Sequence, residues 1–131
     1  MSKIAFDLDG VFIPDCDRIP FLGGQIAFYE LAHFMRPLFL PQGEWDIVTA
    51  RPARFKTMTE KWVNQHFGNK PQNLWHGAIL EDPWVYKAEV INEQKYDIYV
   101  ESDHNIVMKL RARCPNTTVI HLATFLAGEF A

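Results

Sequence analysis

The chain has 131 residues, 48% of them hydrophobic and 22% charged, and a formal net charge of −3. This length is close to the commonest size of one domain, and the composition excludes a disordered or fibrous protein. Because neither sign of charge is gathered into a long run, charge does not favour a nucleic-acid partner, although it leaves one open.

We therefore expect one domain over residues 1–131, built from strands and helices in alternation. Short apolar runs predict strands, and apolar side chains at intervals of three and four residues predict helices. In chain order, the predicted elements are strand 4–8, helix 25–35, strand 45–48, helix 53–67, strand 72–75, helix 83–91, strand 96–100, helix 106–112 and strand 117–122.

Turn and breaker residues support several of these boundaries. Asp9 and Gly10 follow the first strand, Pro37 follows the first helix, and Pro83 suits the first turn of the third helix. Strands that alternate with helices are joined by crossover connections and pair in parallel. The expected fold class is α/β, with three layers around a central, mostly parallel sheet of five strands, as in Rossmann-like folds.

Polar side chains occur where three of the predicted strands end. They are Asp7 and Asp9 at the first strand, Thr49, Ala50 and Arg51 at the second, and Glu101, Ser102 and Asp103 at the fourth. Ligands of a parallel α/β sheet bind outside the carboxyl ends of its strands. We expect these residues to line one site, with Lys87 from the preceding helix beside them.

Asp7 and Asp9 give the strongest indication of chemistry. Carboxylates two residues apart on an extended segment point the same way and repel each other. A divalent cation relieves this repulsion, and Mg²⁺ prefers oxygen ligands while keeping waters that phosphate oxygens can replace. The predicted metal ligands are Asp7, Asp9, Glu101 and Asp103, with Glu101 ranked above Asp103 because it follows its strand directly.

The segment 7–11, with the sequence DLDGV, resembles the first motif of the haloacid dehalogenase superfamily, whose phosphatases carry Asp-x-Asp-Gly-Thr or Val after the first strand. Thr49 resembles the second motif, Lys87 the third and residues 101–103 the fourth, so the similarity spans nearly the whole chain. The fourth motif departs from the usual pattern, because Glu101 replaces an aspartate and Ser102 separates the two acids.

This resemblance implies a Mg²⁺-dependent phosphomonoesterase that works through an aspartyl-phosphate intermediate. Asp7 would be the nucleophile, and Asp9 would protonate the leaving oxygen and then activate water. Thr49 would position the phosphoryl group and Lys87 would offset its charge, while the main-chain carbonyl of Asp9 would also hold the metal. The expected substrate-binding residues are Gly10, Ala50 and Arg51.

Many members of this family insert a cap domain after the first motif or between the second and third. Residues 11–43 and 52–86 are used by predicted loops, helices and a strand, so we expect no separate cap domain. An open site in this family implies a bulky substrate or a cap borrowed from a second subunit, so a homo-oligomer remains an alternative. The expected partner is a phosphorylated small molecule such as a nucleotide, or the exposed phosphate of a larger one.

Aromatic residues near the mouth of such a site could stack on a base or a sugar. The candidates are Phe12, Phe21, Trp75 and Trp84.

Each of the predicted site residues also has a structural interpretation. Thr49 could be a turn or N-cap residue, and Glu101 and Asp103 could cap the helix that follows them. Lys87 could be a solvated helix residue, and Arg51 could form a surface ion pair.

Two other functions are alternatives to the phosphatase. A receiver-like signalling domain combines acids, a threonine and a lysine on a similar sheet, but its phosphoacceptor lies on the third strand, and residues 73–76 contain no aspartate. A catalytically silent phosphate- or metal-binding module would keep the fold without turnover.

The cysteines and the amino-terminal residues indicate the compartment. Cys16 and Cys114 are too few for a disulfide scaffold, so we expect free thiols. Carboxylates interrupt the start of the chain before a signal peptide could form, and no apolar run approaches a membrane span. The sequence therefore predicts a cytoplasmic location, with no membrane partner.

Overall fold

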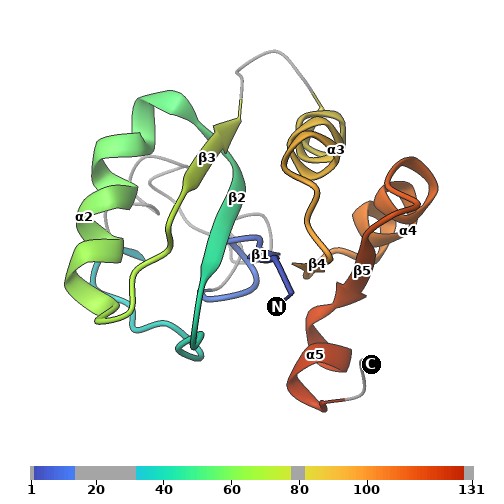
Figure 1. Ribbon diagram of the computed structural model, residues 1–131. Helices are drawn as coiled ribbons and strands as arrows, with labels where there is room; N and C mark the ends of the chain where they lie inside the picture. The colour runs from blue at the N-terminus through green and yellow to red at the C-terminus, as the bar shows by residue number, and fades with distance from the viewer. Residues whose placement is uncertain (1, 14–31, 78–81, 129–131) are drawn as a thin grey trace.

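The computed structural model describes residues 2–13, 32–77 and 82–128, which form an α/β fold (Figure 1). In this part of the chain, five strands form one all-parallel sheet in the order β3-β2-β1-β4-β5. The strands are β1 (Ile4–Phe6), β2 (Trp45–Pro52), β3 (Leu74–Gly77), β4 (Ile98–Glu101) and β5 (Thr118–His121). The helices are the 3-10 helix η2 (Ala53–Phe55), α2 (Lys56–His66), α3 (Pro83–Gln94), α4 (His104–Arg113) and α5 (Leu122–Leu126). The predicted α/β class and Rossmann-like sheet are confirmed.

Alternate residues of each strand point to opposite faces of the sheet, and each face carries its own core. Phe6 and Val100 belong to the cluster that includes apolar residues of α2 and α5. Ala5, Tyr99 and Val119 belong to the second cluster, which includes residues of α3 and α4. The sheet is therefore the middle of three layers, with α2 on one side and α3 and α4 on the other (Figure 1).

The aromatic core corrects one expectation about the substrate. Phe12 is only 1% exposed, and its ring lies 4.7 Å from that of Phe39. Burying a phenylalanine side chain stabilises a fold by roughly 1.5–3 kcal/mol, so Phe12 belongs to the core and is not free to stack on a base. Trp75 packs against the second core cluster and Trp84 lies under Lys109 and Arg113. Phe21 lies outside the described residues.

The first strand ends earlier than predicted, at Phe6 instead of residue 8. The Asp7 N–H still donates to the carbonyl of Val100 over 2.9 Å, so Asp7 remains at the edge of the sheet. Gly10 has a φ of 84°, a left-handed conformation that glycine adopts without strain. Its N–H donates to the Ile13 carbonyl, and this turn directs the chain away from the sheet just after Asp9.

The second strand is longer than predicted, because β3 pairs with it as far as Pro52 after a shift of register beyond Thr49. At this irregularity a Cβ on Gly77 would lie 3.1 Å from the carbonyl oxygen of Ala50. Only glycine lets the two strands approach so closely there. The third strand is correspondingly displaced from residues 72–75 to 74–77.

Other predicted elements agree in kind and differ at their ends. Pro83 does open α3, and β4 and β5 lie within one or two residues of the predicted strands. The short helix α5 was not predicted. The predicted loop 14–24 and all but the last four residues of the predicted helix 25–35 lie outside the described residues.

Two further predictions concern the cysteines and membrane-spanning segments. Cys114 is a buried free thiol, as expected, whereas Cys16 lies outside the described residues. Within residues 2–13, 32–77 and 82–128, the helices are too short or too polar to cross a membrane.

Candidate functional site

Asp7 and Glu101 lie at the carboxyl ends of two strands that are neighbours in the sheet but distant in the sequence. β1 pairs with β4 so that Phe6 stands opposite Val100, and the residues that follow them therefore meet at one edge. β2 and β3 follow β1 on one side of it in the sheet, whereas β4 and β5 lie on its other side. The direction of the strand order therefore reverses between β1 and β4. Open α/β sheets bind ligands at such a switch point.

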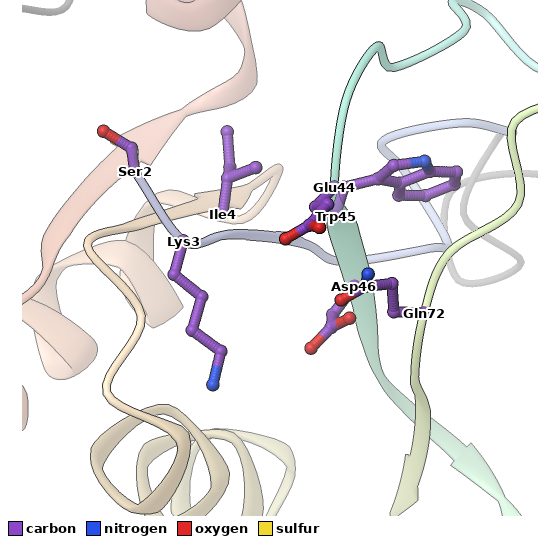
Figure 2. A pocket seen from close by; sticks show the side chains of 7 residues that line it. All are labelled: Ser2, Lys3, Ile4, Glu44, Trp45, Asp46 and Gln72. Atoms are coloured by element: carbon purple, nitrogen blue, oxygen red, sulfur yellow. The ribbon is translucent and has the colours of Figure 1, made fainter.

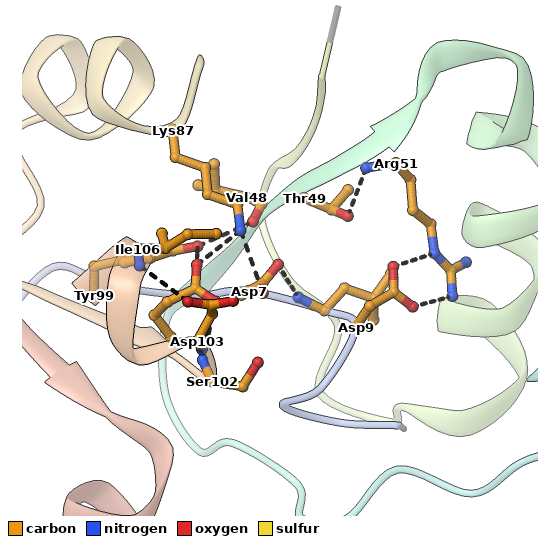
Figure 3. A network of polar contacts seen from close by, with 12 residues as sticks. Asp7, Asp9, Val48, Thr49, Arg51, Lys87, Tyr99, Ser102, Asp103 and Ile106 are labelled. Carbon is orange, nitrogen blue, oxygen red and sulfur yellow. Dashed lines mark hydrogen bonds and ion pairs between the residues drawn. The ribbon is translucent and has the colours of Figure 1, made fainter. Parts of the chain in front are cut away.

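Lys87 reaches this edge from α3 and lies beside Asp7 (Figure 3). Its Nζ is 2.7 Å from Glu101 Oε1 and 3.3 Å from Asp7 Oδ2. All three residues are almost fully buried, with 3% of Lys87, 1% of Glu101 and 5% of Asp7 exposed. Lys87 is therefore not a solvated helix residue, and the structure brings these three predicted site residues together.

The two carboxylates share a single ammonium group, and the pKa values reflect this imbalance. Burial and then Glu101 raise the pKa of Asp7 well above its usual range, although Lys87 opposes them. Burial also acts to raise the pKa of Glu101, but the charge of Lys87 and the hydrogen bonds with Lys87, Asp7 and the Asp103 backbone together lower it. Burial would lower the pKa of Lys87, yet Asp7 and Glu101 together raise it. One ammonium group therefore cannot balance both carboxylates when both are ionised.

Glu101 is held in place through both of its oxygens. Oε2 accepts the backbone N–H groups of Ser102 and Asp103 over 3.0 and 3.3 Å. Oε1 accepts the Tyr99 hydroxyl over 3.3 Å in addition to the Lys87 ammonium. This carboxylate therefore has a fixed orientation beside Asp7 and does not cap α4.

Asp103 has the structural role that the sequence left open. It is the N-cap of α4, and its Oδ1 accepts the N–H groups of Asn105 and Ile106 over 2.8 and 3.1 Å. Such a cap stabilises a helix by about 1 kcal/mol. Lys87 pairs with Asp7 and Glu101 rather than with this residue, so Glu101, and not Asp103, is the acid that faces Asp7.

Asp9 faces away from the lysine and binds Arg51 of β2. Arg51 Nε donates to Asp9 Oδ2 and Nη2 to Oδ1, both over 2.8 Å, while Nη1 donates to the Thr59 hydroxyl over 3.1 Å. Arg51 is 4% exposed, so its guanidinium is buried and forms a bidentate pair with the partly exposed Asp9 carboxylate, and not the surface ion pair considered above. Two parallel hydrogen bonds fix the direction of the Asp9 carboxylate as well as its charge.

Thr49, Ala50 and Gly10 surround this pair at the same edge of the sheet. Thr49 is buried within β2, and its hydroxyl accepts the Arg51 N–H over 3.1 Å. This contact stabilises the irregular end of β2, so Thr49 has a structural role whether or not it also binds phosphate. Ala50 lies beside Gly77, and Gly10 forms the turn after Asp9. Contact of Gly10, Ala50 and Arg51 with a substrate stays a prediction.

The carboxylates of Asp7 and Glu101 suit a Mg²⁺ ion, since Mg²⁺ commonly takes one or two carboxylates and fills its remaining positions with water and phosphate oxygens. Two carboxylates that share one ammonium group also favour an added cation. Within the described ranges, no three acidic, histidine or cysteine side chains are grouped around one metal position. The Asp9 carboxylate binds Arg51 and Asp103 caps α4, so a cation here would rely on Asp7, Glu101, main-chain oxygen and water.

One residue of this edge was not singled out from the sequence. His121 ends β5 opposite Glu101, and its Nε2 lies 2.8 Å from the Ser102 carbonyl oxygen. The sequence places His121 at the end of the predicted strand 117–122. Because parallel strands end at the same edge of the sheet, this position indicates that His121 lies near the other site residues. Nothing in the sequence indicated which group the imidazole would contact.

A hollow lies at the opposite, amino-terminal edge of the sheet (Figure 2). It is lined by Ser2, Lys3, Ile4, Glu44, Trp45, Asp46 and Gln72. Asp46 is buried there, but it accepts the Asn73 N–H over 3.0 Å and the Tyr96 hydroxyl. The hollow contains no predicted site residue, and its buried acid is already paired.

Comparison of the chain with protein-family models, curated proteins and solved structures found no match. A functional assignment therefore rests on the motifs in the sequence and on the arrangement of these side chains. That arrangement comprises a buried carboxylate beside a lysine and a second acid, with an arginine-bound aspartate two residues further along the chain.

Proposed function

We propose that this protein is a Mg²⁺-dependent phosphohydrolase of the haloacid dehalogenase type, without a separate cap domain. Its substrate would be a phosphomonoester, such as a nucleotide or another bulky phosphorylated molecule. The observation that carries the proposal is the placement of Asp7 at the switch point of the sheet, 3.3 Å from the ammonium of buried Lys87 and beside Glu101. Phosphoryl transfer requires a placed nucleophile and concentrated positive charge, and this edge can supply both.

In the first step, an oxygen of the Asp7 carboxylate attacks phosphorus. The bond from phosphorus to the leaving oxygen breaks, and Asp9, in its protonated form, gives that oxygen a proton. Lys87 offsets the charge of the nucleophile and of the phosphoryl oxygens. A bound Mg²⁺ would add positive charge beside Asp7 and Glu101 and so favour the ionised, nucleophilic form of Asp7.

In the second step, Asp9 is a carboxylate and takes a proton from water. The water oxygen attacks phosphorus, the bond from phosphorus to Asp7 breaks, and inorganic phosphate and the original carboxylate are regenerated. Arg51 supports the second step as a positioning residue, because its two hydrogen bonds set the direction of the ionised Asp9 carboxylate. Proton exchange at Asp9 requires that this pair loosen or rotate when a substrate binds.

The receiver-like alternative is disfavoured by the sheet. Receiver domains have the flavodoxin-like order 2-1-3-4-5, whereas β1 of this chain lies between β2 and β4. The strand that would carry a receiver's phosphoacceptor, β3, has the sequence LWHG and no aspartate.

The experiment is to measure phosphate release from a panel of nucleotides, sugar phosphates, phosphopeptides and 3′-phosphorylated oligonucleotides, with Mg²⁺ and with chelator. We expect release from at least one member in Mg²⁺ and none with chelator. Equal release in chelator would exclude a metal-dependent mechanism. No release from any member, combined with Mg²⁺ binding, would instead favour the silent binding module.

A further inference from the structure

The loop that carries Glu101 also holds this carboxylate through its main chain. Glu101 Oε2 accepts the N–H groups of Ser102 and Asp103, so the direction of the carboxylate depends on where that backbone lies. The Ser102 hydroxyl is buried and has no hydrogen-bond partner among the described residues. The Ser102 side chain therefore does not anchor the loop, whereas its main-chain carbonyl is free to accept a hydrogen bond that does.

His121 supplies the contact to that carbonyl. Its Nδ1 accepts the N–H of Ala123 over 3.1 Å, so the ring proton of the neutral imidazole is assigned to Nε2. Nε2 then donates to the Ser102 carbonyl oxygen over 2.8 Å. Nδ1 thus contacts the start of α5, and Nε2 contacts the loop that follows β4.

The plane of the His121 ring is also supported. The ring of His104, at the start of α4, stacks on it with centroids 4.0 Å apart and an interplanar angle of 5°. Pairing of β4 with β5 also fixes the backbone of His121, because Glu101 lies opposite His121 in the sheet. The imidazole is therefore held in a direction from which it can fix the Ser102 carbonyl.

We propose that His121 is a positioning residue for the metal-binding carboxylate of Glu101. Through the Ser102 carbonyl, it holds the loop 101–103 where the Glu101 carboxylate lies beside Asp7. This inference rests on the proposed Mg²⁺-dependent function and adds a residue outside the four motifs. Partners that orient metal-binding carboxylates from outside the ligand set typically change metal affinity by about 10- to 100-fold when they are removed.

A matched pair of variants separates this role from the capping of α5. His121→Gln keeps an amide N–H at about the reach of Nε2, and so can still donate to Ser102, but it loses the acceptor for Ala123. His121→Asn keeps an acceptor at about the position of Nδ1 for Ala123 and loses the donor to Ser102. Titration calorimetry of Mg²⁺ into the metal-free full chain, with thermal unfolding of each variant, reports binding independently of catalysis.

We expect His121→Asn to bind Mg²⁺ about 10-fold more weakly than the wild type, and His121→Gln to bind it with nearly wild-type affinity. At saturating Mg²⁺, turnover by His121→Asn should recover most of the wild-type value. Unchanged affinity in His121→Asn, or equal losses in both variants, would overturn the positioning role while leaving the proposed function intact. A wild-type chain that neither binds Mg²⁺ nor releases phosphate would overturn both.

Discussion

The carboxylate of Asp7 is buried, and it shares the ammonium of Lys87 with Glu101. Burial and the neighbouring acid raise its pKa in the folded protein above the unfolded-state value near 3.8. The folded state therefore binds more protons than the unfolded state once the pH exceeds this value. The contribution of Asp7 to stability is present at acid pH and is lost as the pH rises through the folded-state pKa.

Replacement of Asp7 by asparagine should consequently affect activity and stability in opposite directions. We expect Asp7→Asn to lower kcat by roughly 10⁴-fold or more, as loss of a covalent nucleophile does. In metal-free buffer, the same variant should have a larger free energy of unfolding than the wild type at neutral pH, and this difference should shrink towards about pH 4. Denaturant titrations across this range measure the difference.

Asp82→Asn is a matched control, because it makes the same chemical change at an exposed position. We expect it to leave kcat and the pH dependence of unfolding unchanged. A destabilised Asp7→Asn at neutral pH would contradict the charge imbalance inferred for the cluster.

Arg51 and Asp9 form the second charged contact of the site, and both guanidinium–carboxylate hydrogen bonds are 2.8 Å long. Removing one partner of a buried ion pair leaves the other without compensation. We expect Arg51→Met to lower the free energy of unfolding by roughly 3 kcal/mol. Chemical denaturation measures this loss. The loss should be smaller in the Asp9→Asn background, because the negative charge of Asp9 is already absent there.

Lys61→Met is the matched control for Arg51→Met, since Lys61 is exposed on α2. Its effect should stay within about 0.5 kcal/mol. If Arg51→Met behaved like Lys61→Met, the buried pair would not contribute to the fold.

At the scale of the element, the irregular end of β2 positions Thr49 and Arg51. β3 approaches it so closely that a Cβ on Gly77 would meet the carbonyl oxygen of Ala50 at 3.1 Å and its Cα at 3.2 Å. We expect Gly77→Ala to displace β2 and to destabilise the protein by roughly 1–3 kcal/mol. Activity should fall as well, because Arg51 and Thr49 move with the strand.

Gly68→Ala provides the comparison, because a Cβ at Gly68 would meet nothing within 4 Å. Its unfolding free energy should stay the same or rise slightly. If Gly77→Ala had the same unfolding free energy as Gly68→Ala, the strands would be able to move apart without loss of stability.

The elements themselves differ in how far the sequence predicts them. Apolar periodicity predicts α2, α3 and α4, because their cores are built from residues at regular spacing. The end of β2 was missed because a Thr-Ala-Arg-Pro segment carries turn signals, and only pairing with β3 extends the strand through it. α5 has five residues, too few for a periodic pattern.

Within the site, the sequence predicts which residues lie at the same edge of the sheet, but it does not predict which side chains contact one another. Asp7 and Glu101 lie at the carboxyl ends of β1 and β4, and Thr49 precedes the irregular end of β2. Parallel strands share that edge, so the proximity of these residues follows from the alternation of elements. The pairing of Arg51 with Asp9 and the capping of α4 by Asp103 depend on side-chain directions, which sequence spacing does not specify.

At the scale of the whole molecule, metal binding should be linked to folding. A ligand that binds only the folded state stabilises it by about 2.7 kcal/mol at 100 times its dissociation constant. We expect Mg²⁺ to stabilise the wild type, and Glu101→Gln to abolish this increase. Asp103→Asn should retain the increase, because Asp103 caps α4. Denaturant unfolding at several Mg²⁺ concentrations measures the effect, and loss of the increase in Asp103→Asn alone would reverse the assignment of the two acids.

The central claim is that Asp7 becomes covalently phosphorylated. The most direct measurement is mass spectrometry of the full chain after mixing with Mg²⁺ and p-nitrophenyl phosphate and rapid quenching in acid, followed by peptide mapping. The proposed mechanism predicts a mass increase of one phosphoryl group, located at Asp7 and absent from Asp7→Asn. Turnover without any phosphorylated Asp7, or a phosphoryl group on another residue, would contradict it.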